Sequence, residues 1–463
     1  MNNNKYNFGF VLKISMVSAM GGLLFGYDFV VIGGAKPFYE RFFDITNFAN
    51  LQAWAMSSAL VGCVLGALIS GFVSDKYGRK KTLLCSAFLF IIASLGTGIS
   101  GSFNLFVCFR ILGGLGIGLA SAISPMYIAE VTPSHIRGRF VSLNQMTIVI
   151  GILLAQIVNV LIAEKVPDGA SDQFIAASWN GQIGWRWMFW ACGIPSVLFF
   201  LFTFYIPESP RWLLKVGRQE EAFPVLEKIG GNLYAQQETE SIKATLDDVS
   251  EKVNFRALLN PVYFPILLLG VVLAVFQQWC GINTVFNYAE EIFSAAGYGV
   301  SDTLFNIVIT GSVNLIFTFV AMFTVDRWGR KKLMVFGALG LTINYILLGS
   351  AFFFQLKGVA VLTFVVAAIA IYAMSLAPIV WVILSEIFPN RIRGAAMALA
   401  TFSLWVACFV LTYTFPLLNK WLGASGTFWV YSGICLLGFI FITIKLPETK
   451  GKSLEEIEKT LLR

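Results

Sequence analysis

The chain has 463 residues, of which 57% are hydrophobic and only 13% are charged, and its mean hydropathy is +0.75. Soluble domains carry about 25% charged residues, so this composition excludes a water-exposed globular protein and makes lipid the solvent for most of the chain. The net charge of +7 does not indicate a nucleic-acid partner, because Lys and Arg gather in short loops between apolar runs.

Cysteine and histidine usage excludes two further classes of protein. All seven cysteines lie inside apolar segments, and the single histidine, His135, lies in a polar loop as a solvated residue. An odd set of cysteines buried in this way does not form a disulfide framework. We therefore expect no metal site and no cofactor.

The predicted elements begin with an apolar stretch directly after a short polar N-terminus, which we interpret as a retained membrane span. A bilayer core needs about 20 apolar residues per helix. By this criterion the chain has twelve spans, at residues 10–34, 51–73, 82–103, 105–129, 140–163, 185–206, 262–289, 303–325, 333–354, 360–385, 395–417 and 427–446. The predicted fold class is all-α integral membrane, with twelve transmembrane helices in two six-helix bundles.

One long polar segment separates the two sets of six spans. It contains two runs with helical spacing of Leu and Ile, Glu220–Ile229 and Gln237–Val249, which predict a small cytoplasmic helical domain. The predicted division is therefore an N-terminal bundle (1–206), a cytoplasmic helical linker domain (207–260), a C-terminal bundle (261–446) and a cytoplasmic tail (447–463).

The loop charges predict the orientation. Loops on one face carry most of the basic residues: Lys76, Arg79, Lys80, Lys81, Arg137, Arg139, Arg327, Arg330, Lys331, Lys332, Arg391 and Arg393. Loops on the other face carry fewer: Lys36, Arg41, Lys165, Lys357 and Lys420. The positive-inside rule then places the first face and both termini in the cytoplasm, for a multi-pass protein of the cell membrane.

Three motifs recur in the same order in the two halves. They are Asp75–Lys81 with Asp326–Lys332, Glu130–Gly138 with Glu386–Gly394, and Pro207-Glu-Ser209 with Pro447-Glu-Thr449. Duplicated six-span units are typical of alternating-access transporters, in which the substrate binds between the repeats near mid-bilayer.

With these motifs the chain resembles the sugar porter family of the major facilitator superfamily, nearly from end to end. The signatures are D-x-x-G-R-K at 75–80 and 326–331, P-E-S-P-R-W at 207–212, Q-Q-x-x-G-I-N at 277–283 and P-E-T-K-G at 447–451. The likeness is strongest to the bacterial D-xylose–proton symporters of the family. It implies two pseudo-symmetric bundles and a sugar as substrate.

Two charges inside the spans are candidates for proton coupling. Asp28 lies roughly 9 Å from the outer end of the first span at 1.5 Å per residue, and Arg110 enters the fourth span to a similar depth, so the two can meet. A charge in hydrocarbon indicates function by default. A carboxylate that alternates between Arg and apolar surroundings can bind and release a proton, and in the family's proton symporters an Asp at this position is the proposed proton site. The alternative is a permanent ion pair that fixes two helices.

Amides inside the spans are candidates for sugar binding, because an amide both donates and accepts hydrogen bonds without net charge. Aromatic rings suit the C–H faces of a sugar, and Phe25, Trp381 and Trp405 are available. Gly281, between Gln278 and Asn283, could let the seventh span break. By resemblance, the sugar-contact positions are Gln156, Gln277, Gln278, Asn283, Asn314, Trp381 and Trp405. The alternative is that these amides only hold helices together. The chain departs from the xylose symporter pattern at Ile152, Asn287, Ala377 and Leu404, so the resemblance leaves the particular sugar open.

Repeated loop charges are candidates for a cytoplasmic gate. They are Asp75, Arg79, Glu130 and Arg137 in one half and Asp326, Arg330, Glu386 and Arg393 in the other. Salt bridges among them could latch the cytoplasmic face, since alternating access needs a bistable element. The alternative is that they only anchor helix ends and set topology.

The leading hypothesis is a secondary active transporter that imports a monosaccharide, a pentose or hexose such as D-xylose or D-glucose, with protons by alternating access. Its partners are then the sugar, the proton and the lipid bilayer, and we expect a monomer. The alternatives are a proton-independent sugar facilitator and a transporter-like sugar sensor. No nucleophile–base or metal constellation indicates an enzyme.

Overall fold

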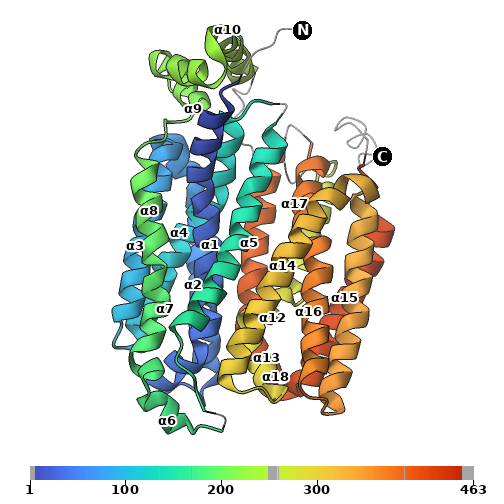
Figure 1. The fold of residues 1–463 in the computed structure, drawn as a ribbon. Coiled ribbons are helices and arrows are strands. Elements are labelled where there is room, and N and C mark those ends of the chain that lie inside the picture. The colour runs from blue at the N-terminus through green and yellow to red at the C-terminus, as the bar shows by residue number, and fades with distance from the viewer. Residues whose placement is uncertain are drawn as a thin grey trace. The chain divides into compact units, whose positions relative to one another are not determined.

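The structure is a computed structural model that describes residues 6–134, 136–167, 169–248, 258, 260–389 and 392–450, without the side chains of 245–248, 326, 393 and 394. His135, Arg391, Val249 and the tail beyond 450 lie outside the described residues. Every regular element within the described residues is a helix, which confirms the predicted all-α fold class (Figure 1).

The first six predicted spans correspond to long helices. They are α1 (Phe8–Phe42), α2 (Ala49–Tyr77), α3 (Arg79–Ile99), α4 (Phe103–Val131) and α5 (Arg137–Ile162), followed by a sixth span built from η1 (Asn180–Gly184), α7 (Trp185–Ala191) and α8 (Gly193–Thr203). A short helix, α6 (Asp172–Ala177), precedes the sixth span.

The second set of spans has more interruptions. It comprises α11 (Phe264–Trp279) with α12 (Ile282–Asn287), then α14 (Val300–Trp328), α15 (Arg330–Phe353), α16 (Val359–Met374) with α17 (Leu376–Ile387), and α18 (Arg393–Lys445). The short helix α13 (Ala289–Ala295) follows α12. At about 1.5 Å per residue, α18 would be far longer than the roughly 30 Å bilayer core. Gly423 breaks it with a φ of 67°, which divides α18 into two spans and completes the predicted twelve.

Large apolar side chains on these helices point outward. Phe72 is 70% exposed and Phe323 is 72% exposed, and both lie in helices that are long and apolar enough to cross a membrane. Exposed apolar surface of this extent needs lipid as its solvent, and an α-helix satisfies its own backbone hydrogen bonds there. The chain is an integral membrane protein.

The chain divides into two compact units. The first comprises Met1–Asp28, Val61–Ile152 and Phe189–Lys252, and the second comprises Phe29–Leu60, Leu153–Met188 and Val253–Arg463. In the first unit α2 and α4 approach closely because glycines lie at their crossing: a Cβ on Gly62 would overlap the Ile111 carbonyl, and one on Gly118 would overlap the Cys63 carbonyl. Small residues at such crossings let membrane helices pack backbone against backbone.

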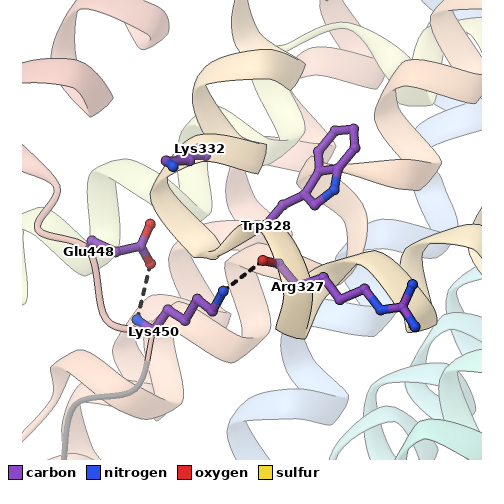
Figure 2. Close-up of a pocket in the computed structure, with 5 residues that line it drawn as sticks. All are labelled: Arg327, Trp328, Lys332, Glu448 and Lys450. Carbon is purple, nitrogen blue, oxygen red and sulfur yellow. Dashed lines mark hydrogen bonds between the residues drawn. The ribbon is translucent and has the colours of Figure 1, made fainter.

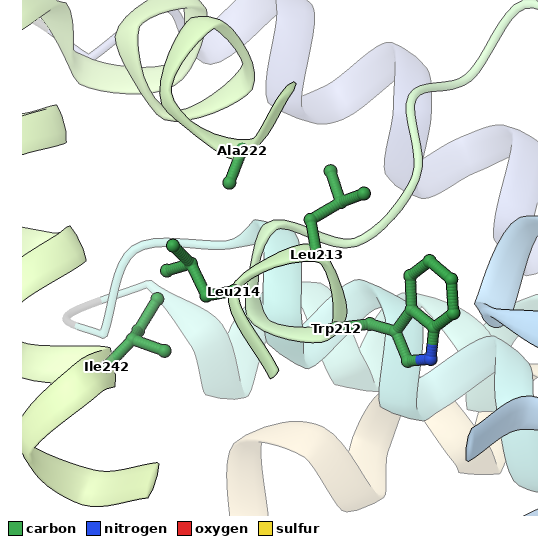
Figure 3. Packing of buried hydrophobic residues seen from close by; sticks show 5 residues of the cluster. All are labelled: Trp212, Leu213, Leu214, Ala222 and Ile242. Atoms are coloured by element: carbon green, nitrogen blue, oxygen red, sulfur yellow. The ribbon is translucent and has the colours of Figure 1, made fainter. Parts of the chain in front are cut away.

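A small helical cap belongs to the first unit. It consists of α9 (Pro210–Lys215) and α10 (Gln219–Asp248), and Gly231 breaks α10 with a φ of 83°. Its core contains Trp212, Leu213, Leu214, Ala222 and Ile242 (Figure 3). The Asn7 amide donates to the Ile229 carbonyl at 2.8 Å, which joins the cap to the start of α1. The two predicted runs, Glu220–Ile229 and Gln237–Val249, both fall in α10, one before and one after Gly231, as far as the described residues extend; α9 was not predicted.

The first helix is longer than its predicted span. Its predicted end is near residue 34, whereas α1 continues to Phe42 and contains Lys36, Pro37 and Arg41. The assignment of Lys36 and Arg41 to an outer loop was therefore wrong. Lys36 is 2% exposed, and buried carboxylates compensate its charge, as described below.

Candidate functional site

Asp28 and Arg110 form a buried ion pair in the first unit, between α1 and α4. The Arg110 Nη1 atom lies 3.0 Å from both Asp28 carboxylate oxygens, and Nη2 donates to the Asp28 backbone carbonyl at 3.3 Å. Asp28 is 4% exposed and Arg110 is 2% exposed. The guanidinium also lies over the Phe189 ring, 5.6 Å from its centroid. The predicted meeting of the two side chains is confirmed, although α1 continues to Phe42, well beyond the end near residue 34 from which the depth of Asp28 was counted.

The second unit contains the amides predicted to bind sugar, and Gln156 is the most unusual of them. It lies on α5, is 1% exposed, and neither Nε2 nor Oε1 has a hydrogen-bond partner among the described residues. Its Oε1 fills the space where a Cβ on Gly311 of α14 would be. A buried amide without partners costs free energy, so Gln156 is the least satisfied of the predicted sugar contacts among the described residues.

A chain of amides lies where the seventh span breaks. Gly281 has a φ of 87°, between the end of α11 and the start of α12, which confirms the expected break. On α11, Gln277 Nε2 donates to the Leu376 and Ala377 carbonyls at 3.2 and 3.1 Å, and Gln278 Nε2 donates to Gln277 Oε1 at 3.4 Å. These bonds hold the end of α11 against the start of α17.

Asn283, at the start of α12, extends this chain. Its Nδ2 donates to Gln278 Oε1 and contacts Cys408 Sγ at 3.4 Å. Gln277 thus anchors the chain to the backbone of α17, while Gln278 and Asn283 orient each other. Asn283 is only partly buried, in contrast to Gln277 and Gln278.

The remaining predicted sugar contacts are more dispersed. Asn314 follows Gly311 by three residues on α14 and is 6% exposed. Trp405 on α18 is buried, and Trp381 on α17 is 38% exposed. Phe25 is half-buried on α1, in the first unit, three residues before Asp28.

The charged loop between α2 and α3 is built around Gly78 and Glu208. Gly78 has a φ of 95°, and the Glu208 carboxylate occupies the space where a Cβ on Gly78 would be. From there it accepts hydrogen bonds from the first free N–H groups of α3, at Arg79 (2.9 Å) and Lys80 (3.1 Å). Burial raises the pKa of Glu208, while these N–H donors act in the opposite direction.

Arg79 joins this loop to the end of α4. Its side chain reaches Glu130 at 3.0 Å and Asp75 at 3.2 Å. Asp75 also pairs with Lys215 of α9 at 3.0 Å, and its backbone carbonyl accepts a hydrogen bond from the Trp212 indole. The predicted group Asp75, Arg79 and Glu130 is thus brought together. Arg137 is exposed at the start of α5, with no ion pair among the described residues.

The second unit repeats the loop geometry between α14 and α15. Gly329 has a φ of 89°, and Glu448 accepts hydrogen bonds from the Arg330 and Lys331 N–H groups at 2.9 and 3.2 Å. Lys450 donates to the Arg327 carbonyl at 2.6 Å, beside a pocket that also includes Trp328 and Lys332 (Figure 2).

Arg330 pairs with Glu386 at 3.2 Å, as Arg79 pairs with Glu130 in the first unit. The side chains of Asp326 and Arg393, the other two predicted members of this set, lie outside the described residues.

One charged cluster was missed by the sequence reasoning. Lys36 of α1 lies 2.8 Å from Glu291 and 3.6 Å from Glu290, both of α13, and 3.1 Å from Glu40. The spacing of Lys36 and Glu40 is a signal of helix continuation, since side chains four residues apart lie on one face of a helix. The contact with α13 has no local signal, because its partners lie far apart in the chain.

Comparisons with known proteins agree with this geometry. The family model described as "Sugar (and other) transporter" matches residues 14–461. The chain is 40% identical to the D-xylose-proton symporter of Escherichia coli (strain K12), with 98% of this chain and 96% of the relative covered. It is 37% identical to the arabinose-proton symporter of Bacillus subtilis (strain 168), with 99% and 96% covered.

A solved structure extends the agreement to three dimensions. The xylose transporter XylE from E. coli, in a partially occluded inward-open conformation, matches with a TM-score of 0.84 and 38% identity, over 96% of this chain and 100% of that chain. The predicted likeness to the bacterial D-xylose–proton symporter is confirmed, and so is the fold of the major facilitator superfamily. All of these relatives are transporters, in agreement with the prediction that the chain is not an enzyme.

Proposed function

Because the chain belongs to the family of sugar transporters, we propose that it imports a monosaccharide together with protons by alternating access. The substrate is a pentose or a hexose, and D-xylose, L-arabinose and D-glucose are the sugars to test first. The observation that carries the proposal is the buried pair of Asp28 and Arg110, in a chain whose relatives include proton symporters.

Asp28 is the proposed proton site. Paired with Arg110, the carboxylate has its charge compensated, because the guanidinium contacts both of its oxygens. If the transport cycle separates the two, the carboxylate is left in an apolar span, where a charged group is costly. Arg110 keeps two further partners, the Asp28 backbone carbonyl and the Phe189 ring. Arg110 is therefore the fixed member of the pair and the carboxyl is the exchangeable one.

Gln156 is the proposed centre of the sugar site. Its amide can accept from one hydroxyl and donate to another, and it has no described protein partner that a sugar would have to displace. Gln277, Gln278, Asn283 and Asn314 extend the amide surface within the second unit. Trp381 and Trp405 are the aromatic residues of this unit proposed to cover the apolar face of the ring.

The loop charges are proposed to form the cytoplasmic gate, in two copies. One copy contains Asp75, Arg79, Glu130 and Arg137, and the other contains Asp326, Arg330, Glu386 and Arg393. In each copy a carboxylate from the end of the bundle caps the helix that begins with the arginine: Glu208 caps α3 and Glu448 caps α15. This cap supports the gate by fixing the backbone that carries the arginine.

The proposed orientation follows from the basic loops, with both termini and the helical cap in the cytoplasm of a cell with an inner membrane. We also propose the four-part division of the chain into two bundles, a cap and a tail. We propose that the protein is a monomer.

Transport in reconstituted vesicles tests the proposal. Wild-type protein in vesicles with an alkaline lumen should concentrate labelled xylose, arabinose or glucose, with the other sugars as competitors. The Asp28→Asn variant should exchange sugar but fail to concentrate it. Asp172→Asn is the matched control, because it makes the same change in an exposed Asp–Arg pair, with Arg41 at 2.8 Å. Accumulation by Asp28→Asn would show that the proton is bound elsewhere.

A proton-independent facilitator is the second candidate, and one observation favours it. Arg110 also bonds the backbone carbonyl of Asp28, as a permanent clamp between α1 and α4 would do. A facilitator would equilibrate the sugar in the same vesicles, with or without the pH gradient, and would never concentrate it.

A further inference from the structure

A buried group of one lysine and three glutamates joins α1 to α13 in the second unit. The Lys36 side chain is 2% exposed, and those of Glu40, Glu290 and Glu291 are 6%, 14% and 20% exposed. Lys36 Nζ lies 2.8 Å from Glu291 and 3.1 Å from Glu40, so these two carboxylates share one ammonium group. We call these four residues the Lys36 cluster.

The groups around the cluster are neutral. Gln52 of α2 donates to Glu40 at 3.3 Å, which is one further hydrogen bond for that carboxylate. The hydroxyls of Tyr39 and Tyr288 are directed to other partners, the Met56 Sδ atom at 3.2 Å and the Thr412 carbonyl at 2.7 Å respectively. Among the described residues, Lys36 is the cation that forms ion pairs with the three carboxylates.

The charge balance of the Lys36 cluster is unfavourable if every carboxyl is ionised. One ammonium then faces three carboxylates, which leaves two uncompensated negative charges in a buried place. Carboxylates that share one site do not all stay ionised, because like charges at close range disfavour each other. One Glu291 oxygen, Oε2, is buried without a hydrogen-bond partner among the described residues, which adds to the cost of its charge.

We propose that the Lys36 cluster is a second proton-binding site, separate from Asp28, which holds a proton shared by Glu40 and Glu291 while α1 and α13 are joined. Glu290 is the most distant of the three glutamates from Lys36, at 3.6 Å. The proton is a property of the pair of carboxyls rather than of one residue.

The helices that meet here can also part. Gly33 of α1 lies one turn before Lys36, and a Cβ there would be 3.1 Å from the Asn287 carbonyl at the end of α12. Tyr288, with a φ of −115° and a ψ of 25°, interrupts the helix between α12 and α13. If α13 moves away from α1, Lys36 retains Glu40, its neighbour on the same helix, and the glutamates of α13 become hydrated.

Parting and proton release are therefore linked. Burial raises the pKa of Glu291 in the joined state, against the opposing effect of Lys36, and hydration returns it to its ordinary range. Proton binding stabilises the joined state fully below the ordinary carboxyl pKa, and this contribution is lost as the pH rises through the raised pKa. For one linked proton the population ratio changes by up to about tenfold per pH unit. In the orientation proposed above, the cluster lies at the outer end of α1, so the outer solution supplies the proton.

Infrared spectroscopy of the purified full chain tests this proposal directly, by the C=O absorption of protonated carboxyls as the pH is raised. Wild type and Asp28→Asn should both keep the C=O band at pH values above the ordinary carboxyl pKa. In Glu40→Gln/Glu291→Gln the band should become smaller at these pH values, leaving the contribution of Glu208, whose pKa burial also raises. Glu164→Gln is the matched control, an exposed glutamate of the same unit. Lys36→Met should keep the band to a higher pH than wild type, because the opposing cation is gone. A merely structural role would not produce this shift.

Two outcomes would overturn the proposal: a band that is unchanged in Glu40→Gln/Glu291→Gln, or a band that is lost in Lys36→Met. If the double variant does not fold, Glu291→Gln alone should still lower the pH at which the band disappears. The orientation of the Lys36 cluster toward the outer solution rests on the proposed function, but the expected spectra do not depend on it. Failure of sugar accumulation in vesicles would refute the transport proposal and leave the spectroscopic result standing.

Discussion

Removing the charge of Asp28 tests whether the pair with Arg110 is energetically coupled as its geometry indicates. Deleting one partner of a buried ion pair costs about 3–5 kcal/mol, because the other charge is left uncompensated. Arg110 is always charged, but it keeps the Asp28 backbone carbonyl at 3.3 Å and the Phe189 ring. These contacts place the expected loss for Asp28→Asn at about 2–3 kcal/mol.

A double-mutant cycle separates this coupling from general damage. Arg110→Met alone should cost less than Asp28→Asn, because a buried aspartate can be neutralised by a proton whereas an arginine cannot. The double variant Asp28→Asn/Arg110→Met should lose less free energy of unfolding than the sum of the two single variants, since neither charge is then left without its partner. The free energy of unfolding in detergent micelles is the quantity to measure. If the loss in the double variant equals the sum of the two single losses to within about 0.5 kcal/mol, the two residues are not coupled.

Single contacts elsewhere in the molecule give three more testable expectations. Gln156→Leu should lower sugar affinity about tenfold or more without lowering the unfolding temperature, because the amide has no described protein partner; a loss of stability with unchanged sugar binding would identify Gln156 as interhelical glue. Gly281→Ala should cost about 1–3 kcal/mol of stability and slow uptake, because its φ is 87° and a Cβ would lie 2.8 Å from the Tyr431 ring, and an unchanged unfolding temperature would contradict this. Burial raises the pKa of Glu208, so its carboxyl stabilises the folded state most at acidic pH. As the pH rises through that raised pKa, the free energy of unfolding of wild type should fall relative to that of Glu208→Gln. Parallel pH profiles of the two proteins would show that Glu208 is not the group responsible.

The spans were predictable because the length of each apolar run defines them. The ends of the spans were predictable wherever no charged residue with a buried partner lies there. At α1 this reasoning failed. Lys36 followed by Pro37 has the appearance of a helix end, yet the lysine is buried against carboxylates and the helix continues for more than another turn. A charged residue can lie inside a helix of this kind when an oppositely charged partner is near. The partners of Lys36 on α13 cannot be recognised from the sequence around Lys36.

The meeting of Asp28 and Arg110 was predictable because each is a charge inside an apolar span, where it needs a partner. Which amides are already satisfied was not, because it depends on tertiary contacts. Gln277 bonds the backbone of α17, whereas Gln156 has no described partner beside Gly311. The sequence reasoning treated the two as equivalent sugar contacts, and the structure gives them different surroundings. The sequence showed the loops at Gly78 and Gly329 only as repeated motifs. The structure adds that the carboxylates of Glu208 and Glu448 cap the helices that begin there.

Proton entry driven by sugar alone is the decisive test of coupled transport. Vesicles containing the purified protein and a pH-sensitive dye, with equal pH on both sides, receive xylose, arabinose or glucose from outside. We expect the lumen to acidify as the sugar enters, and we expect Asp28→Asn to abolish the acidification. Sugar entry into wild-type vesicles without any change in luminal pH would contradict proton coupling.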